Sequence, residues 1–432
     1  MQTDPRPAEP HETNLKLTLR PGHPDFLDLP WDLSLGHWAG HCARLEEVTR
    51  GVSRHPVVFV NYSGGLYALK ELSPDLAAKE YQLLVQMEEL RLPVVNPVGF
   101  VSTHTSAGER SVLITRYLDR SLPYRSLFMR SRLEQFRDHL LNAIAGLLVQ
   151  LHLAGVYWGD CSLSNTLFRR DAGALQAYLV DAETAEVYPP RLSPTLRHHD
   201  LEIMESNIDG DLNDLAANRF LTANVSILDT GEHIRQRYHR LWEEITREQI
   251  LNPDERYRIQ ERIRALNNLG FAVRDVEMHA TDVGDKLRFR VMVTDRNFHR
   301  DQLLGLTGLE AEEMQARQMM NEIQEVKATL SQAINRSTPL SAAAFHWLEH
   351  IYQPVMKQIE PILSQEDYID EKISSGEVYC QILENKWYLS ERAQHDVGHQ
   401  AAVEDYIRRF RKDRSPGSQN GDLADPLERS AS

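Results

Sequence analysis

Between a long amphipathic pattern and a short apolar run, the chain reads Gly155-Val156-Tyr157-Trp158-Gly159-Asp160-Cys161-Ser162-Leu163-Ser164-Asn165-Thr166-Leu167-Phe168. Asp160 and Asn165 stand five residues apart, so one short loop can present both polar side chains to a single cleft. The apolar run ends on Asp181, which puts a further carboxylate at the end of an expected strand. Transfer of a phosphoryl group from ATP needs one carboxylate to orient or deprotonate the acceptor hydroxyl, and two ligands for Mg²⁺. Asp160 fits the first task, and Asn165 and Asp181 fit the second.

A second pattern, upstream of this stretch, supplies groups that could hold phosphates. Tyr67-Ala68-Leu69-Lys70 has the small–apolar–lysine sequence of a strand whose lysine contacts the α- and β-phosphates. Glu80 lies in the next expected helix, where its carboxylate can pair with Lys70 and hold it in position. An exposed strand lysine and a solvated helix glutamate are the alternative interpretation of this pair.

The turn over residues 50–55 lies between an expected strand that begins near Leu45 and the apolar run 57–60, where a phosphate-covering loop would belong. Gly51 would allow the backbone to approach a nucleotide closely, and Ser53 or Arg54 could donate hydrogen bonds to phosphate. The turn holds one glycine where such loops carry three, so a plain hairpin turn explains it equally well.

Hydrophobic periodicity predicts an α+β protein whose first half is an antiparallel strand cluster followed by a helical lobe. The apolar runs 57–60 and 66–69 flank a Ser-Gly-Gly turn and read as two strands. Helical spacing over residues 74–90 and 131–153 predicts two helices, the second of them long and amphipathic.

The sequence pattern of the second half of the chain predicts a mainly helical α+β domain. Alternating residues over 286–293 indicate a hairpin with 271–280, and further helices are expected over 341–360 and 390–410. Thr307, followed by Glu310, has the capping-box signature of a helix start. The expected domains are a flexible segment 1–30, a nucleotide-binding domain 31–220, a C-terminal domain 221–411 and a disordered tail 412–432.

Composition excludes several classes of function. With 48 Lys and Arg against 63 Asp and Glu, the formal net charge is −15, which disfavours nucleic acid or an anionic membrane as the main partner. The three cysteines, Cys42, Cys161 and Cys380, are scattered, which fits a reducing compartment and argues against a disulfide framework or zinc cluster. Neither a signal-peptide core nor a transmembrane run is evident, so we expect a cytoplasmic protein.

Residues 40–190 resemble the bacterial lipopolysaccharide kinase (Kdo/WaaP-like) branch of the protein-kinase-like superfamily. The resemblance rests on Tyr67 to Lys70, Glu80, the Gly159-Asp160…Asn165 loop and Val180-Asp181. It implies a two-lobed fold that binds ATP and Mg²⁺, followed here by a domain of unknown function. For that second match the relevant stretches are Gly51 to His55, Leu306 to Gly308 and Tyr379 to Glu391.

Three departures from the protein kinases narrow the resemblance. Trp158-Gly159 stands where protein kinases carry His-Arg, so a phosphorylated activation loop has no evident arginine partner. Asp181 is followed by Ala182-Glu183 where Phe-Gly is expected, and no Ala-Pro-Glu motif follows. These departures are typical of kinases that act on small molecules or lipid-linked saccharides.

Other polar residues are interpreted more simply. His395 and His399 stand four apart, a spacing able to bind metal, but no third ligand is evident, and surface or core histidines are favoured. The pair His198-His199 is interpreted likewise, although the acidic run beginning at Asp200 could border an active site. Asp160 and Asn165 taken alone could be ordinary turn residues.

The leading hypothesis from the sequence is therefore an enzyme, a kinase that transfers phosphate from ATP to a hydroxyl group of an unidentified acceptor. A saccharide, lipid or other small molecule is favoured as acceptor over protein. A pseudokinase that binds nucleotide and acts as a scaffold, with a protein partner on the C-terminal domain, is the main alternative. Transfer of AMP in place of phosphate is a minor third one.

Overall fold

The computed structural model describes residues 14–48, 54–63, 65–105, 108–128, 133–217, 229–247, 249–251, 273–280, 287–293, 297–363 and 373–412. The chain divides into two compact units, of which the first comprises Met1–Arg169 and Ala174–Arg296. The second unit comprises Arg170–Gly173 and Asn297–Ser432. The main division thus lies later than the predicted boundary at residue 220, and a four-residue internal turn goes with the second unit. The predicted disordered tail lies outside the described residues, apart from its first residue.

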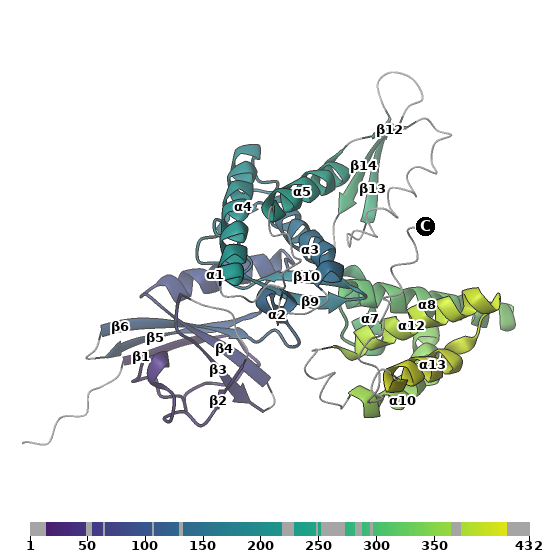
Figure 1. Ribbon diagram of the computed structural model, residues 1–432, viewed down its shortest axis with the longest axis horizontal. Coiled ribbons are helices and arrows are strands. Elements are labelled where there is room, and N and C mark those ends of the chain that lie inside the picture. Colours follow the sequence, from purple (N-terminus) through teal and green to yellow (C-terminus); the bar gives the residue numbers. More distant parts are fainter. Residues whose placement is uncertain are drawn as a thin grey trace, which may run out of the picture. The chain divides into compact units, whose positions relative to one another are not determined.

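An antiparallel six-stranded sheet forms the first lobe of the first unit (Figure 1). Its strands lie in the order β1 (Asn14–Leu19), β5 (Pro97–Thr105), β6 (Gly108–Arg116), β4 (Gly65–Leu72), β3 (Val57–Tyr62) and β2 (Leu45–Glu46). The strands predicted at 57–60 and 66–69 are confirmed as β3 and β4, which pair antiparallel. Helix α1 (Leu76–Glu89) packs against β5 and β6, within the range predicted for it.

Alternation along β4 decides which side chains reach the interior between the lobes. Tyr67 and Leu69 are buried in an aromatic cluster with Phe26, Trp31 and Trp38 on one face of the sheet. Successive side chains of a strand point to opposite faces. Lys70 therefore leaves β4 on the other face, toward α1.

The N-terminal segment differs from its prediction as a flexible stretch. Strand β1 pairs with β5 from Asn14 opposite His104 to Leu19 opposite Gly99, and Phe26 is fully buried. Leucines at 15, 17 and 19 alternate with polar residues, which gives β1 an apolar face that packs on the aromatic cluster. The Pro-, His- and Asp-rich composition of the segment favours a flexible stretch, whereas the alternating leucines favour a strand, and the strand is what forms.

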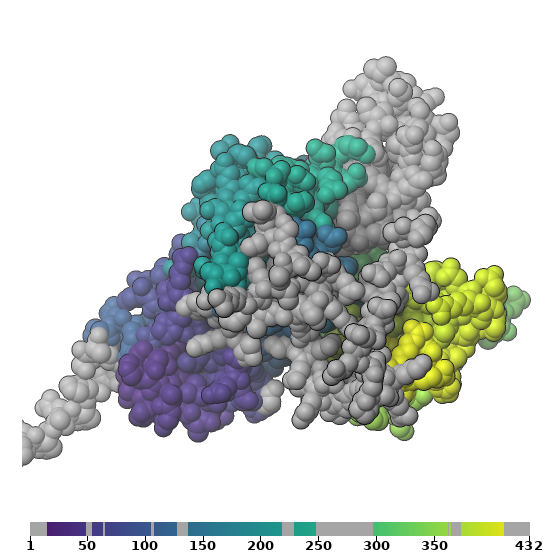
Figure 2. All heavy atoms as spheres, viewed as in Figure 1, coloured from purple at the N-terminus to yellow at the C-terminus, as the bar shows by residue number. Residues whose placement is uncertain are grey.

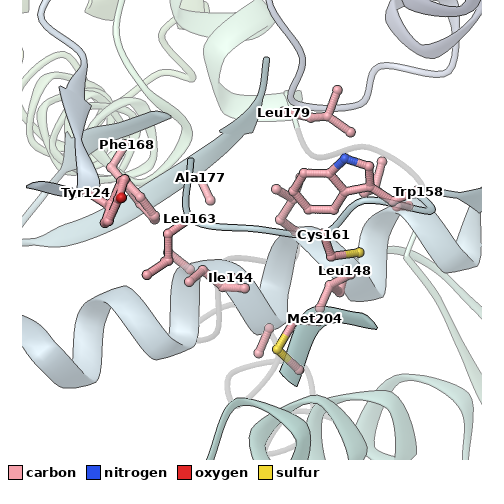
Figure 3. Close-up of a cluster of buried hydrophobic side chains, with 14 of the residues drawn as sticks. Tyr124, Ile144, Leu148, Trp158, Cys161, Leu163, Phe168, Ala177, Leu179 and Met204 are labelled. Atoms are coloured by element: carbon pink, nitrogen blue, oxygen red, sulfur yellow. The ribbon is translucent and has the colours of Figure 1, made fainter. Parts of the chain in front are cut away.

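The second lobe of the first unit is built on helix α3 (Leu133–Leu153), which contacts α5 (Thr230–Thr246) and β10 (Ala174–Leu179). Its apolar face meets buried side chains of the loop after β8 (Val156–Tyr157), as Figure 3 shows for Trp158, Cys161 and Leu163 beside Ile144 and Leu148. Helices α4 (Pro194–Ala217) and α5 pack together and expose their outer faces (Figure 2). The remaining elements are β7 (Leu122–Pro123), α2 (Tyr124–Phe128), β9 (Thr166–Asp171), β11 (Glu186–Val187), β12 (Gln249–Leu251), β13 (Val273–Ala280) and β14 (Leu287–Val293).

The pairing of β13 with β14 confirms the hairpin predicted for 271–280 and 286–293. Helix α5 ends at Thr246, and the short strand β12 begins at Gln249.

From Asn297 onward, the described residues of the second unit form helices and their connections. Its helices are α7 (Phe298–Thr307), α8 (Glu313–Ala333), α9 (Leu340–Trp347), a π-helical turn (Leu348–Tyr352), α10 (Gln353–Leu363), α12 (Ser375–Ala393) and α13 (Gly398–Lys412). The predicted helix start at Thr307 is wrong, because Thr307 ends α7 and the capping box is formed by Glu312 and Gln315 at the start of α8. In the described part of the chain, no helix is both long and apolar enough to cross a membrane.

Buried polar groups tie the helices of the second unit together. Glu322 of α8 accepts hydrogen bonds from Trp347 Nε1 at 2.6 Å and from the Tyr379 hydroxyl at 2.5 Å. His399 Nε2 lies 2.5 Å from the other oxygen of Glu322. His399 is thus part of the core network, as the simpler interpretation of that histidine predicted.

Candidate active site

Lys70 lies at the centre of the candidate site. Its Nζ is 3.1 Å from Glu80 Oε2 and 2.7 Å from Asp181 Oδ2, with Glu183 Oε2 at 3.8 Å. Glu80 comes from α1 and is fully buried, and its Oε1 accepts the backbone N–H of Ala182 at 3.2 Å. The structure therefore places Lys70, Glu80 and Asp181 together, from three separate segments of the chain.

The charges around Lys70 favour its ammonium form. Burial acts to lower the pKa of Lys70, but the carboxylates of Glu80 and Asp181 outweigh burial and raise it. Burial raises the pKa of Glu80, and the ammonium of Lys70 opposes that rise. One ammonium faces three carboxylates here, because Glu183 is the third, and a divalent cation can balance the excess negative charge.

Two amide side chains hold the carboxylate of Asp160. Asn165 Nδ2 donates to Asp160 Oδ2 at 3.0 Å and to the Asp160 carbonyl oxygen at 3.1 Å. Asn207 Nδ2 of α4 donates to Asp160 Oδ1 at 2.9 Å. The two oxygens of Asp160 are thereby fixed in direction, while each retains a lone pair for another donor.

Asp200 of α4 anchors the loop that carries Asp160. The carboxylate of Asp200 is fully buried and accepts the backbone N–H groups of Trp158 at 2.7 Å and Gly159 at 2.8 Å. His152 Nε2 lies 3.1 Å from the same carboxylate, and its Nδ1 lies 2.8 Å from the Tyr238 hydroxyl. Burial lowers the pKa of His152, which fits a neutral ring that donates to Asp200 and accepts from Tyr238.

The same loop has a second anchor and a required glycine. Asp211, also on α4, accepts the backbone N–H groups of Leu163 at 2.9 Å and Ser164 at 3.1 Å. Gly159 has a φ of +77°, and a Cβ there would lie 2.9 Å from the carbonyl oxygen of Thr184. Glycine is therefore needed directly before Asp160, in the position where protein kinases carry arginine.

Backbone hydrogen bonds join this loop to the segment that carries Asp181. The Val180 N–H donates to the Asn165 carbonyl at 3.1 Å, and Trp158 Nε1 donates to the Asp181 carbonyl at 3.3 Å. The Thr184 hydroxyl donates to the Trp158 carbonyl at 2.9 Å. Together with the contacts of Lys70, these bonds bring the loop, the Asp181 segment and α1 to one place in the first unit.

The expected phosphate-covering turn is only partly described. Gly51 and Ser53 lie outside the described residues, and Arg54 is exposed. His55 Nε2, at the end of that turn, lies 3.2 Å from Glu183 Oε2, beside the carboxylates that face Lys70. The interpretation of Gly51, Ser53 and Arg54 as phosphate-binding residues stays a prediction.

Sequence reasoning noted that the acidic run beginning at Asp200 could border an active site, but it did not identify the polar residues of α4 as those that hold the loop. Asp200, Asn207 and Asp211 stand at positions i, i+7 and i+11, which lie on one face of a helix. The same stripe holds the buried Met204 and Ile208. The sequence signal for these residues is their position on the apolar stripe of the helix. Polar groups buried on such a stripe need hydrogen-bond partners.

If the first unit transfers phosphate from ATP, as the sequence predicts, Asn207→Ala is expected to lower kcat by about tenfold to a hundredfold, because Asp160 then loses one of the two amides that orient it. The KM for ATP should change little, since Asn207 contacts Asp160 and not the Lys70 cluster. Steady-state kinetics would measure both constants. Asn213→Ala, an exposed change on the same helix, is the matched control. An unaltered kcat, or an equal loss in the control, would remove Asn207 from the site.

Comparison with known proteins gives a match for each half of the chain. Residues 64–226 match the model of the lipopolysaccharide kinase (Kdo/WaaP) family, and residues 240–410 match a domain of unknown function, DUF4032. No curated protein matches the chain. One solved structure, titled "WaaP in complex with acyl carrier protein", is 16% identical with a TM-score of 0.35, covering 59% of this chain and 99% of that chain.

The antiparallel first lobe and the helical second lobe agree with the family match in giving a two-lobed kinase-like fold. The chain therefore joins a lipopolysaccharide-kinase-like domain to a C-terminal domain of unknown function.

Proposed function

We propose that the first unit is an ATP- and Mg²⁺-dependent phosphotransferase that acts on a hydroxyl group. The observation that carries the proposal is the ion pairing of Lys70 with Glu80 at 3.1 Å and Asp181 at 2.7 Å. This cluster is joined to the loop of Asp160 and Asn165 by the hydrogen bond from Val180 to the Asn165 carbonyl. A binding site for a triphosphate needs a cation for the phosphates and carboxylates for the metal in one place, and this arrangement provides both.

Each polar residue has a role in the proposed reaction. Lys70 binds the α- and β-phosphates, and Glu80 holds the ammonium in position. Asp160 accepts the proton of the acceptor hydroxyl or orients that hydroxyl, and its carboxylate is held by Asn165 and by Asn207. Gly51, Ser53 and Arg54, which precede β3 in the sequence, would cover the phosphates.

Asn165 and Asp181 would hold Mg²⁺. The amide nitrogen of Asn165 is used by Asp160, so its amide oxygen is the atom suited to bind a cation. Asp181, two residues after the end of β10, supplies carboxylate oxygens. Mg²⁺ prefers carboxylate and amide oxygens as ligands. The ion would neutralise charge on the phosphates during transfer.

The acceptor is proposed to be the hydroxyl of a saccharide, a lipid or another small molecule. Gly159 stands in place of the arginine that would pair with a phosphorylated activation loop. Its positive φ would strain any residue that carries a Cβ at this position. Regulation of the type found in protein kinases is therefore not supported at this position.

A pseudokinase scaffold is the alternative from another class. The C-terminal domain would then bind a protein partner, and the nucleotide would serve regulation. Retention of Lys70, Glu80, Asp160, Asn165 and Asp181 within one bonded arrangement favours the enzyme, because a scaffold needs none of that chemistry. Transfer of AMP in place of phosphate would be distinguished by the mass added to the product.

A thermal-shift titration with ATP, with and without Mg²⁺, tests the proposal at its first step. ATP at about a hundred times its Kd should raise the Tm of the first unit by roughly 5–10 °C when Mg²⁺ is present, and by less in EDTA. Release of ADP in the presence of candidate hydroxyl acceptors then tests turnover. Absence of any shift with ATP and Mg²⁺ would contradict both the enzyme and the nucleotide-binding scaffold. A shift without turnover would favour the scaffold.

A further inference from the structure

The turn between β9 and β10 belongs to the second unit, together with the last two residues of β9. The rest of β9 and all of β10 belong to the first unit. Ala172 and Gly173 connect the strands, with φ of 52° and 82°. Two positive φ values in a two-residue connection are the pattern of a type I′ turn, which favours Asn-Gly. Alanine is strained in this conformation because of its Cβ, so surrounding contacts must hold it there.

Glu377 supplies those contacts from the first turn of α12. Its Oε2 accepts the Ala172 N–H at 2.7 Å, and its Oε1 accepts the Gly173 N–H at 2.9 Å. The Glu377 side chain is itself buried and fixed by Gln315 Nε2, which donates to Oε2 at 2.9 Å. The methyl group of Ala172 packs against the hydrophobic core of the second unit.

The preceding residues of the turn are held from α8. Asp171 Oδ1 accepts the backbone N–H groups of Met314 at 2.9 Å and Gln315 at 3.0 Å, at the start of that helix. Gln315 Nε2 also donates to the Arg170 carbonyl at 3.0 Å. Burial and the nearby carboxylate of Glu312 raise the pKa of Asp171 to about 7, and Glu377 adds to the rise. Grouping buried carboxylates in this way is costly, so stability alone does not account for the arrangement.

The other end of the same hairpin carries the proposed metal ligands. Strand β9 begins directly after Asn165, and β10 ends two residues before Asp181. The bond from the Val180 N–H to the Asn165 carbonyl closes that end of the hairpin. The third strand of this sheet, β7, pairs with β9 only at Leu167 and Phe168, near the Asn165 end. The turn end of the hairpin extends beyond that pairing, so its alignment depends on what holds the turn.

We infer that Glu377 is a positioning residue: through the β9–β10 turn, the C-terminal domain sets the alignment of Asn165 and Asp181 for binding Mg²⁺ with ATP. The inference rests on the proposed function and gives the C-terminal domain a task within it. Glu377 acts through the hairpin and does not touch the nucleotide. Its loss therefore affects binding that requires Mg²⁺ more than binding that does not.

The full-length Glu377→Gln variant tests the inference. Its amide NH₂ would face one of the two N–H donors of the turn, so the turn loses an acceptor while the side chain keeps its size. Amide hydrogen exchange over 166–179 should become faster. The gain in ATP affinity on adding Mg²⁺, measured by calorimetry, should fall about tenfold, with affinity in EDTA unchanged. Glu391→Gln, an exposed change on the same helix, is the control and should match the wild type in both measurements.

The outcomes separate this inference from the proposed function. If the wild type binds ATP with Mg²⁺ and Glu377→Gln behaves like the control in either measurement, the inference is overturned and the proposed function stands. If hydrogen exchange rises but affinity falls equally with and without Mg²⁺, the role of Glu377 is structural support alone and the inference is also overturned. If the wild type binds no ATP, the proposed function fails and the inference fails with it. Glu377→Asp, which keeps the charge but shortens the reach, should give an intermediate loss that supports positioning.

Discussion

Asp181→Asn is expected to lower ATP turnover about a thousandfold. Asparagine has the shape of aspartate but lacks the negative charge that binds a cation. Its NH₂ group would also face either the Lys70 ammonium, now 2.7 Å from Asp181 Oδ2, or the Glu183 N–H, now 3.1 Å from Asp181 Oδ1. The stabilisation by ATP that depends on Mg²⁺ should disappear with turnover.

The fold should survive this change, because Lys70 keeps its partner Glu80 and the side chain of Asp181 is partly exposed. ADP release and the thermal shift with ATP, measured in Mg²⁺ and in EDTA, would check both expectations. Asp209→Asn, the same substitution at an exposed position of α4, is the matched control. Turnover equal to that of the control would take Asp181 out of the mechanism.

The parts of the site that the sequence predicted are those with a local signal. Lys70 lies in an alternating strand, so its face follows from β4 alone, and Glu80 lies in the helix that comes next. Asp160, Asn165 and Asp181 stand in a motif with fixed order. In each case the chemistry could be inferred within a stretch of about 25 residues, without knowledge of which distant segments would meet.

The parts that were missed depend on contacts between distant segments. Asp200 and Asn207 contact the loop that carries Asp160 across more than 40 positions of sequence, and these contacts follow from the packing of α4 on that loop. At the turn of Ala172 and Gly173, the sequence lacks the Asn-Gly pair that favours this turn. The hydrogen bonds that hold the turn come from Glu377, 205 positions later, which no local pattern could indicate. The helix start at Thr307 was wrong for a related reason: the side chain that caps α8 is a glutamate, which is an uncommon N-cap.

The second large effect is expected from Asp200→Ala, this time on stability. The carboxylate of Asp200 satisfies two backbone N–H groups and the ring of His152. Trp158 and His152 are buried, and Gly159 is partly buried. Removing the acceptor leaves those donors without a partner, and breaking a buried polar pair of this kind costs about 3–5 kcal/mol of unfolding free energy. Turnover should be lost as well, because Trp158 and Gly159 set the direction of Asp160.

Asp200→Asn separates the charge of Asp200 from its role as an acceptor. Its amide oxygen can still accept an N–H group of the loop, and the neutral His152 can exchange tautomers so that Nε2 accepts from the new NH₂. The loss of unfolding free energy should therefore be roughly 1–2 kcal/mol, clearly smaller than for alanine. Urea unfolding of both variants beside Asp209→Asn measures the difference. Equal stability of the alanine variant and this control would mean that the loop is held by its apolar contacts, Trp158, Cys161 and Leu163, and that the carboxylate contributes little.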